Sequence, residues 1–208
     1  MFEDAVMLAL QRHGREPASP WVRRWSDLVT PGGTVLDIAC GSGRHLHWFA
    51  ARGHPVVGVD RSAEALATLD DLRARGHAQL VRADIENGPW PLMLGHHPRT
   101  FDAVVVTNYL WRPLFPTIVH SLAPGGVLLY ETFANGNASV GKPSRPDFLL
   151  ANGELLQVCA GLRVVAYEDG FCAQPARFVQ RIAALRPAVV PIAHPQADNA
   201  ETPARYPL

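Results

Sequence analysis

Two aspartates flank a short turn that contains two glycines. Asp37 lies in the apolar run TVLDIA at 34–39, the turn Gly41-Ser42-Gly43 follows, and Asp60 ends the apolar run PVVGVD at 55–60. Glycines one residue apart permit a tight turn and the close approach of a ligand to the backbone. A carboxylate before the turn would repel a pyrophosphate but attract an ammonium group, and a carboxylate after it can accept bonds from two ribose hydroxyls. The pattern indicates a ligand with a ribose at one end and a cationic amino acid at the other.

The same turn is incomplete as the dinucleotide fingerprint G-x-G-x-x-G, because Leu46 stands where the third glycine belongs. A nicotinamide-dependent oxidoreductase is therefore disfavoured. Tight binding of a nicotinamide cofactor would be the observation that supports it.

The elements that position these residues follow from the hydrophobic pattern. Apolar runs predict strands, and predicted helices alternate with them. These helices are at 44–53, after the N-cap Ser62, and from Leu114 to Leu122 with one apolar face. We read 87–100 as a loop. The predicted strands lie at 34–39, 55–60, 78–84, 101–107, 127–133, 162–169 and 176–186. Such alternation predicts an α/β fold, Rossmann-like and doubly wound, with a mostly parallel seven-stranded sheet, helices on both faces and an antiparallel strand near the C-terminus.

The chain length of 208 residues suits one domain. In such sheets ligands bind beyond the carboxyl ends of the strands, where Asp37, Asp60 and Asp84 all fall. We expect a single domain over 1–186 and a Pro- and Ala-rich tail. Its parts are an N-terminal helical cap at 1–30, a cofactor-binding core at 34–133, a candidate lid loop at 134–151 and the tail at 187–208.

Composition narrows the partners. With 19 basic and 19 acidic residues, the chain has no net positive charge that would attract a phosphate backbone. We therefore do not expect nucleic acid as a partner. Three scattered cysteines suit a reducing compartment, and acids stand near the N-terminus where a signal peptide carries positive charge. No apolar run reaches the ~20 residues of a membrane span. We expect a cytoplasmic protein without a membrane segment, and the oligomeric state stays open.

Histidines raise the question of a metal. The nine histidines include His45 with His47 and His96 with His97, but side chains at i and i+2 on a helix diverge, and no dense Cys/His ligand pattern occurs. We expect no metal site.

Five segments, in order, resemble the motifs of class I S-adenosylmethionine-dependent methyltransferases over roughly residues 34–133. They are VLDIACGSGRH, VVGVDRS, VRADIEN, FDAVVVTNYLW and LAPGGVLLYETF. Ala39 stands where the family motif D-x-G-C-G-x-G has its first glycine, a variation that should leave the turn intact. Within the family, YETFANGN and GKPSRPDFLLANGELL resemble small bacterial members, with looser similarity to tellurite-resistance methyltransferases.

The resemblance implies S-adenosyl-L-methionine as cofactor and assigns residues to its parts. Asp37 and the backbone of Ala39, Cys40, Gly41, Ser42 and Gly43 would line the methionine part. Asp60 would hold the ribose, with Arg61 beside the adenine, and Asp84 and Ile85 would meet the adenine amino group and ring. Asn108 and Tyr109, after the fourth strand, would line the pocket on its methyl-acceptor side.

Methyl transfer from a sulfonium is an in-line displacement, so the protein mainly positions the reactants and excludes water. A soft nucleophile such as a thiolate needs no strong base, whereas an oxygen or nitrogen acceptor often does. The catalytic candidates are Tyr109, His45 and Glu131, which form no evident dyad by spacing. The alternative is capping or surface polarity for His45 and a structural hydrogen bond for Glu131.

Three basic residues are candidates for binding the acceptor. Arg112 follows the fourth strand, and Lys142 and Arg145 lie in the candidate lid loop with only Asp147 opposed. We hypothesise that the loop charges attract an anionic or carboxylate-bearing acceptor. The alternative is that they are ordinary solvated loop charges.

The predicted function is methyl transfer from S-adenosylmethionine to a small molecule that the sequence does not identify. The segment TNYLW differs from the Asn-Pro-Pro-aromatic tetrad of enzymes that methylate amino groups of flipped bases. The alternative is an S-adenosylmethionine-binding protein without transferase activity that acts as a sensor or partner subunit. Turnover with a real acceptor separates the two.

Overall fold

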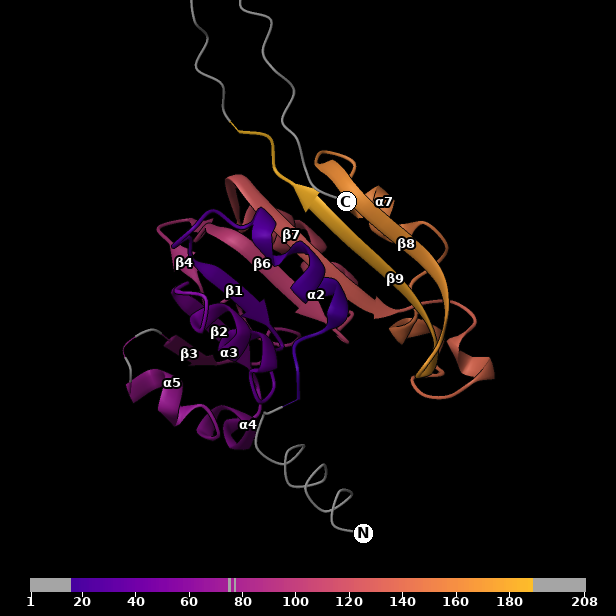
Figure 1. Cartoon of the computed structure of the whole chain (residues 1–208), viewed down its shortest axis with the longest axis horizontal. Coiled ribbons are helices and arrows are strands. Elements are labelled where there is room, and N and C mark those ends of the chain that lie inside the picture. The colour runs from indigo at the N-terminus through magenta and orange to yellow at the C-terminus, as the bar shows by residue number, and fades with distance from the viewer. Residues whose placement is uncertain (1–15, 75, 77, 189–208) are drawn as a thin grey trace, which may run out of the picture.

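One mixed sheet of seven strands organises the protein (Figure 1). The structure, a computed structural model, describes residues 16–74, 76 and 78–188. The strand order is β3-β2-β1-β6-β7-β9-β8, in which the first five are mutually parallel and β9 runs antiparallel to both β7 and β8. The strands are β1 (Val35–Ile38), β2 (Val56–Asp60), β3 (Ala78–Arg82), β6 (Phe101–Thr107), β7 (Leu122–Phe133), β8 (Arg163–Ala173) and β9 (Ala176–Leu185). The predicted fold class is confirmed.

Short helices cover both faces of the sheet. On one face buried side chains come from α2 (Pro20–Trp25), α3 (Arg44–Ala50), α4 (Ala63–Ala67) and α5 (Asp70–Ala74). On the other they come from the 3-10 turn η2 (Arg112–Leu114), α6 (Phe115–His120) and α7 (Glu154–Val158). The remaining 3-10 turns are η1 (Ser26–Leu28), η3 (Asn137–Ser139) and η4 (Pro146–Phe148).

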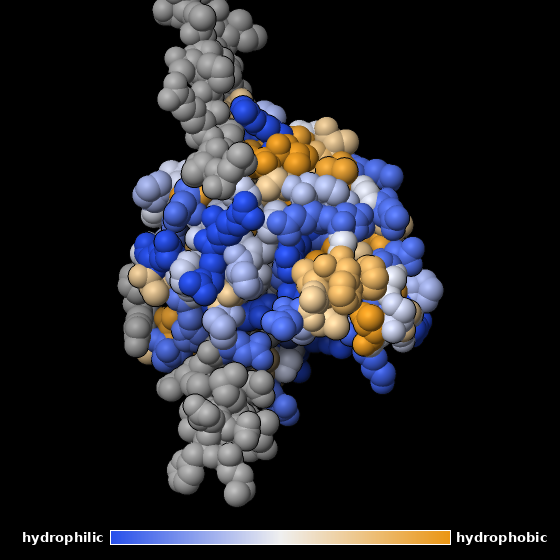
Figure 2. Space-filling view, turned by 45° about the vertical axis from the view of Figure 1, so that its right-hand side comes forward, coloured by the Kyte–Doolittle hydropathy of each residue, from blue (hydrophilic) through white to orange (hydrophobic). Residues whose placement is uncertain are grey.

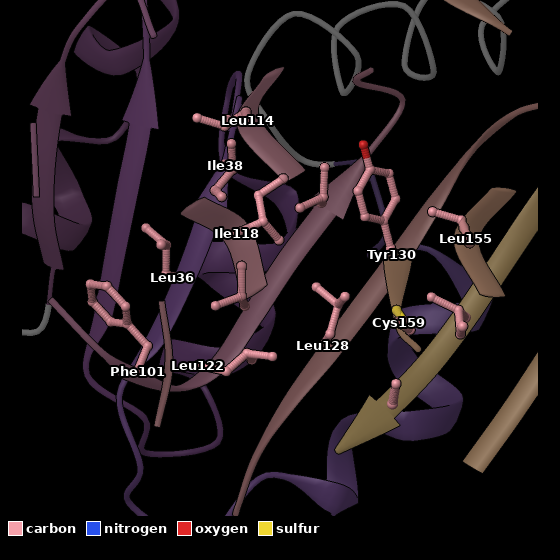
Figure 3. Packing of buried hydrophobic residues seen from close by; sticks show 14 of the residues in the cluster. Leu36, Ile38, Phe101, Leu114, Ile118, Leu122, Leu128, Tyr130, Leu155 and Cys159 are labelled. Atoms are coloured by element: carbon pink, nitrogen blue, oxygen red, sulfur yellow. The ribbon is translucent and has the colours of Figure 1, made fainter. Parts of the chain in front are cut away.

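The strands are apolar on both sides, as burial under two helical layers requires. Leu36, Ile38 and Leu128 point into the cluster beneath α6 and α7, whereas Val35 and Leu129 point into the cluster beneath α2 and α3. Figure 3 shows the first cluster, which also contains side chains from η2, α6 and α7. Complete burial of each such aliphatic side chain stabilises the fold by about 1.5–3 kcal/mol.

Local signals set several element boundaries as predicted. The Ser62 hydroxyl accepts a bond from the Ala65 amide at 3.1 Å and caps α4, and Gly53, at φ +85°, follows the end of α3. In the N-terminal cap, Trp21 and Trp25 are buried against the sheet. Residues 1–15 of the expected cap and most of the expected tail, 189–208, lie outside the described residues.

Two predictions about elements were wrong. The stretch 87–100, read as a loop, contains the hairpin of β4 (Met93–Leu94) and β5 (His97–Pro98), which turns at Gly95 in the left-handed region. The helix expected to reach Leu122 ends at His120, and Leu122 begins β7 by pairing with Phe101. In that case the ladder of the sheet overrode an apolar helical spacing.

No helix within the described residues is both long enough and apolar enough to cross a membrane. Across the same residues, no group of three or more His, Cys, Asp or Glu side chains is arranged to hold a metal ion.

Candidate functional site

A pocket of ≈ 220 Å³ lies at the carboxyl edge of the parallel strands. The β1-α3 turn, the end of β2 and the segments after β3 and β6 form it, which is the place where doubly wound sheets bind ligands. Its lining residues are Ala39, Asp60, Arg61, Ala83, Asp84, Ile85, Glu86 and Tyr109. Six of these eight were predicted as site residues from the sequence.

The β1-α3 turn is built from left-handed backbone. Gly41 has φ +52° and Gly43 has φ +73°, a region that glycine adopts without strain. A Cβ at Gly41 would meet nothing within 4 Å, whereas one at Gly43 would lie 2.5 Å from a methyl carbon of Leu69. Ala39, at φ +53°, takes the same region with a side chain. The turn is therefore present, as predicted, although Ala39 replaces a glycine. The left-handed conformation of Ala39 causes local backbone strain.

Asp60 fastens this turn to the end of β2. Its carboxylate accepts a bond from the Gly41 amide at 2.8 Å through one oxygen and from the Ser62 amide at 2.8 Å through the other. Each carboxylate oxygen has a second lone pair, so both remain able to accept a ribose hydroxyl. The side chain predicted to hold a ribose thus also shapes the loop around it.

The opposite wall of the pocket follows β3 and β6. Hydrogen bonds from the Asn87 side chain and from the amides of Glu86 and Asn87 hold the pKa of Asp84 below its ordinary value. Burial and the nearby Glu86 carboxylate raise the pKa of Tyr109, so its hydroxyl stays protonated at neutral pH. Ile85 adds an apolar surface to the same wall.

Asn108 and Tyr109 are held in place from β7. Asn108 has φ +53°, and its amide donates to the Glu131 carbonyl at 2.9 Å. The hydroxyl of Tyr130 donates to the Tyr109 carbonyl at 2.8 Å. The labelled Tyr130 hydroxyl in Figure 3 points away from the leucines around its ring. Hydrogen bonds to backbone groups of this segment therefore hold it in place, and Tyr109 lines the pocket.

A buried chain of polar groups lies beside the pocket. Asp37 is 1% exposed, and its Oδ2 has no hydrogen-bond partner among the described residues. His45 Nδ1 lies 3.6 Å from that oxygen, and His45 Nε2 accepts the amide of Ser19 at 3.3 Å. Because Nε2 is an acceptor, the proton of the neutral ring is on Nδ1, facing Asp37. His45 thus lies between α2 and the acid of β1.

Glu131 is also buried and has several partners. The hydroxyl of Ser19 donates to its Oε1 at 2.9 Å, and Arg181 Nε forms an ion pair with its Oε2. An Arg177 nitrogen lies 4.0 Å from Oε1. Ser19, the N-cap of α2, therefore connects His45 with Glu131, and a catalytic role for either side chain stays a prediction.

Cys40 lies beneath the turn. Burial, followed by the nearby charges of Asp37 and Asp60, raises the pKa of its thiol. The thiol is therefore neutral at physiological pH and is not an activated nucleophile.

Part of the chain is similar to a known family of domains. Residues 35–126 match the family described as "Methyltransferase domain". This span, less than half of the chain, is similar to a methyltransferase domain, and the sheet around it has the strand order described above. The match spans the pocket-forming turn, the end of β2 and the segments after β3 and β6. The predicted resemblance is confirmed.

Individual relatives share less. The chain is 32% identical over 115 residues to a tRNA U34 carboxymethyltransferase of Klebsiella pneumoniae, a match covering 51% of this chain and 32% of that relative. TehB from Haemophilus influenzae has a TM-score of 0.62 and 20% identity, covering 79% of this chain and 61% of TehB. The glycopeptide N-methyltransferase MtfA, in complex with S-adenosyl-L-methionine, has a TM-score of 0.55 and 21% identity, covering 80% and 92% of the two chains. The two structures show the fold alone, and the chain spans about a third of its curated relative.

Arg112 is engaged by the segments that follow the methyltransferase core. Its Nε and Nη2 donate to the two carboxylate oxygens of Glu154 at 2.7 and 2.9 Å. Further bonds run to the carbonyls of Asp147 at 3.0 Å and Leu149 at 2.8 Å. A bidentate pair of this kind fixes both partners. The predicted role of Arg112 in substrate binding stays a prediction, and the structure places its guanidinium on the 134–151 loop and α7.

Lys142 and Arg145 are exposed on the 134–151 loop and are not among the lining residues of the pocket. Arg145 pairs with Asp147 at 2.8 Å and lies over the ring of Phe148. In Figure 2 a patch of apolar side chains stands out from the mostly hydrophilic surface, on the side where β8, β9 and this loop lie in Figure 1. Exposed apolar side chains from these segments include Val140, Phe148 and Phe171. Arg145 thus contacts an exposed apolar side chain, and the role of both cations in substrate binding stays a prediction.

The sequence did not predict a role for Ser19, Glu86, Arg177 or Arg181. Ser19 followed by Pro20 is an N-cap signature that could have been read, because serine caps and proline suits the first helical position. Arg177 and Arg181 lie four residues apart in a strand and therefore share a face. This spacing predicts that the two side chains share a face of the strand, but it does not predict their contact with Glu131.

Proposed function

We propose that the protein is an S-adenosylmethionine-dependent methyltransferase that acts on a small molecule. The observation that carries the proposal is the pocket at the ends of β2 and β3, beside a turn in which Gly41 faces open space. The matched methyltransferase domain supports it. The cofactor would supply an electrophilic methyl group on a sulfonium.

The residues present fit this cofactor. We propose that Asp60 accepts the ribose hydroxyls, that Ile85 and Arg61 flank the adenine, and that Asp84 accepts its amino group. The unpartnered Oδ2 of Asp37 suits the ammonium of the methionine part, since a buried carboxylate oxygen without a partner is unfavourable. The backbone of the turn from Ala39 through Cys40, Gly41 and Ser42 to Gly43 would lie against the same part.

The protein contributes positioning and exclusion of water to the proposed reaction. Asn108 and Tyr109 would border the reacting atoms, on a segment held by β7. The Tyr109 hydroxyl is protonated at neutral pH and can donate a hydrogen bond, but it is a poor base. His45 and Glu131 are occupied by Ser19 and their ionic neighbours. Of the three catalytic candidates none is poised as a free base, which favours an acceptor that arrives already nucleophilic, such as a thiolate.

The 134–151 loop is proposed as a lid over the acceptor side. The bonds from Arg112 to its last residues and to Glu154 support this role, because they tie the loop to η2 next to Tyr109. Replacing Lys142 and Arg145 together by Ala should then raise KM for the acceptor and leave kcat unchanged. Equal KM values in both proteins would mean that these side chains are solvated loop charges.

We further propose a cytoplasmic location, which the three free cysteines support. We also keep the expectation that the acceptor is not a nucleic acid. Methylation of tRNA by the purified protein would overturn that part, and the name of the Klebsiella relative makes it a necessary control.

Calorimetric titration of S-adenosylmethionine, S-adenosylhomocysteine and NAD into the purified protein tests the proposal. We expect micromolar binding of the first two and none of NAD. Folded protein that binds neither sulfur compound would refute the proposal, and preferential binding of NAD would point to an oxidoreductase. If the cofactor binds, methyl transfer from radiolabelled S-adenosylmethionine to thiols, carboxylic acids and metalloid oxyanions separates an enzyme from a binding protein that acts as a sensor or partner subunit.

A further inference from the structure

Arg177 lies beyond the end of the parallel part of the sheet. The pairing of β7 with β9 ends at Phe133 opposite Val179, so Arg177 is two residues past the last pair. Because β9 is antiparallel to β7, this extension projects past the carboxyl end of β7. Arg177 is therefore at the ligand-binding edge, although its strand lies outside the residues that match the methyltransferase family, 35–126.

The Arg177 side chain points to the face that carries Asp37 and His45. Residues two apart in a strand share a face, so Arg177, Val179 and Arg181 project together. The contacts of Arg177 and Arg181 with Glu131 confirm that this is the face of the buried polar chain.

Glu131 does not need Arg177 as its counter-ion. Its carboxylate already pairs with Arg181 at 2.5 Å and accepts the Ser19 hydroxyl at 2.9 Å. Arg177 is farther away, at 4.0 Å, and its side chain is 19% exposed. Its Nε is buried without a hydrogen-bond partner in the described part of the chain. A guanidinium with unused donors, next to an anion that is already neutralised, is suited to a second anion.

The strand order places this cation on the acceptor side of the site. Along the edge the order is β3, β2, β1, β6, β7 and β9. The pocket proposed for the adenosine lies at β2 and β3, Asp37 lies on β1, and Asn108 follows β6. Arg177 on β9 is thus separated from the adenosine pocket by Asp37 and by the segment proposed to border the methyl group.

We propose that Arg177 binds a carboxylate of the methyl acceptor, with Arg181 as a positioning residue that neutralises Glu131. This inference rests on the proposed function and narrows the acceptor to carboxylate-bearing molecules. The planar fork of a guanidinium matches a carboxylate by two parallel hydrogen bonds, which a lysine cannot supply. The methionine part of the cofactor carries a carboxylate as well, so the test must distinguish the two sources.

Nitrogen-15 NMR of the arginine Nε–H groups reads this site directly. The probe is sodium acetate, added to protein saturated with S-adenosylhomocysteine while sodium chloride keeps the ionic strength constant. Arg177→Gln identifies the Arg177 signal by its loss. Arg73→Gln, which removes one positive charge from an exposed side chain on α5, is the matched control.

We expect the Arg177 signal to shift saturably with acetate in the wild-type protein and in Arg73→Gln. In Arg177→Lys, acetate affinity read on the Asn108 amide should fall about tenfold, because the charge stays but the fork is lost. A signal that moves on addition of S-adenosylhomocysteine and then ignores acetate would overturn the proposal and assign Arg177 to the cofactor carboxylate. A signal that ignores both would overturn it and leave Arg177 as a structural cation.

The same spectra separate this proposal from the proposed function. Binding of S-adenosylhomocysteine is read on the Gly41 amide, which is far along the edge from β9. If that amide does not move, the proposed cofactor site fails. If it moves and Arg177 does not respond to acetate, only the acceptor proposal fails.

Discussion

Replacing Asp60 by Ala tests the cofactor pocket and the loop that builds it in one experiment. The change removes two hydrogen bonds from backbone amides to a carboxylate, both at 2.8 Å. Hydrogen bonds to charged groups contribute about 1.5–3 kcal/mol each, and the lower end applies because Asp60 is only half-buried. We therefore expect the free energy of unfolding, measured in urea, to fall by about 3 kcal/mol. Since natural domains have about 5–15 kcal/mol of stability, the variant should remain folded in water.

The affinity should fall by a separate amount. Loss of two ribose hydroxyl bonds of about 1.5 kcal/mol each corresponds to a roughly 100-fold higher Kd for S-adenosylhomocysteine, at 1.4 kcal/mol per tenfold. Calorimetry on the folded variant measures it. Asp70→Ala, which removes an exposed carboxylate from α5, is the control and should change neither quantity by more than the error.

Two results would each contradict a different role of Asp60. A folded Asp60→Ala protein that binds within threefold of the wild type would refute the ribose assignment. A variant with wild-type stability would instead show that Asp60 does not fasten the turn. Asp60→Asn keeps one acceptor oxygen, but its NH₂ group faces one of the two amide donors. Its free energy of unfolding should therefore lie between those of the wild type and Asp60→Ala.

Three further predictions concern the β1-α3 turn and the ion pair between Arg112 and Glu154. Ala39→Gly should relieve left-handed strain and stabilise the protein by about 1 kcal/mol, raising the thermal midpoint by about 2–4 °C in calorimetry; a lower midpoint would contradict the strain. Gly43→Ala should lower the free energy of unfolding by about 1–3 kcal/mol more than Gly41→Ala, because its Cβ would lie 2.5 Å from Leu69 while Gly41 faces open space; equal losses in urea would show that Leu69 moves aside. Burial opposes ionisation of Glu154, but the hydrogen bonds from Arg112 and from the Ala151 amide hold its pKa below its ordinary 4.5. Its contribution to stability is therefore complete above that pH and is lost as the pH falls through the folded-state value. Urea unfolding from pH 7 to 3 should show a difference between the wild type and Glu154→Gln that shrinks toward acid, and a constant difference would exclude this linkage.

The sheet could be predicted because its strands are short apolar runs that end in polar residues. Val35 to Ile38 and Phe101 to Thr107 are buried on both faces, which leaves little ambiguity about where they lie. Leu122 was placed in a helix because its spacing from Ile118 fits one. Only the pairing of Leu122 with Phe101, a contact across the sheet, decides for the strand.

The ordered motifs predicted which residues form the pocket, but not which hydrogen bonds connect them. Asp60 could be assigned to the site from its place at the end of a strand, but its bond to Gly41 depends on how the turn folds back. From the sequence, His45 could belong to the site or serve in capping or surface polarity. Its contact with Asp37 and Ser19 joins segments 26 residues apart, which no local pattern encodes.

The Ser19 cap also limits how the chain can be shortened for expression. A fragment cut to the matched span, 35–126, would omit Ser19 together with Glu131 and Arg181. A fragment that begins after residue 30 would keep Glu131 and Arg181. It would lose Ser19, whose hydroxyl donates to Glu131 and whose amide donates to His45. The span similar to relatives is therefore shorter than the smallest unit that keeps these buried charges paired, which begins no later than Ser19 and extends at least to Arg181 in β9.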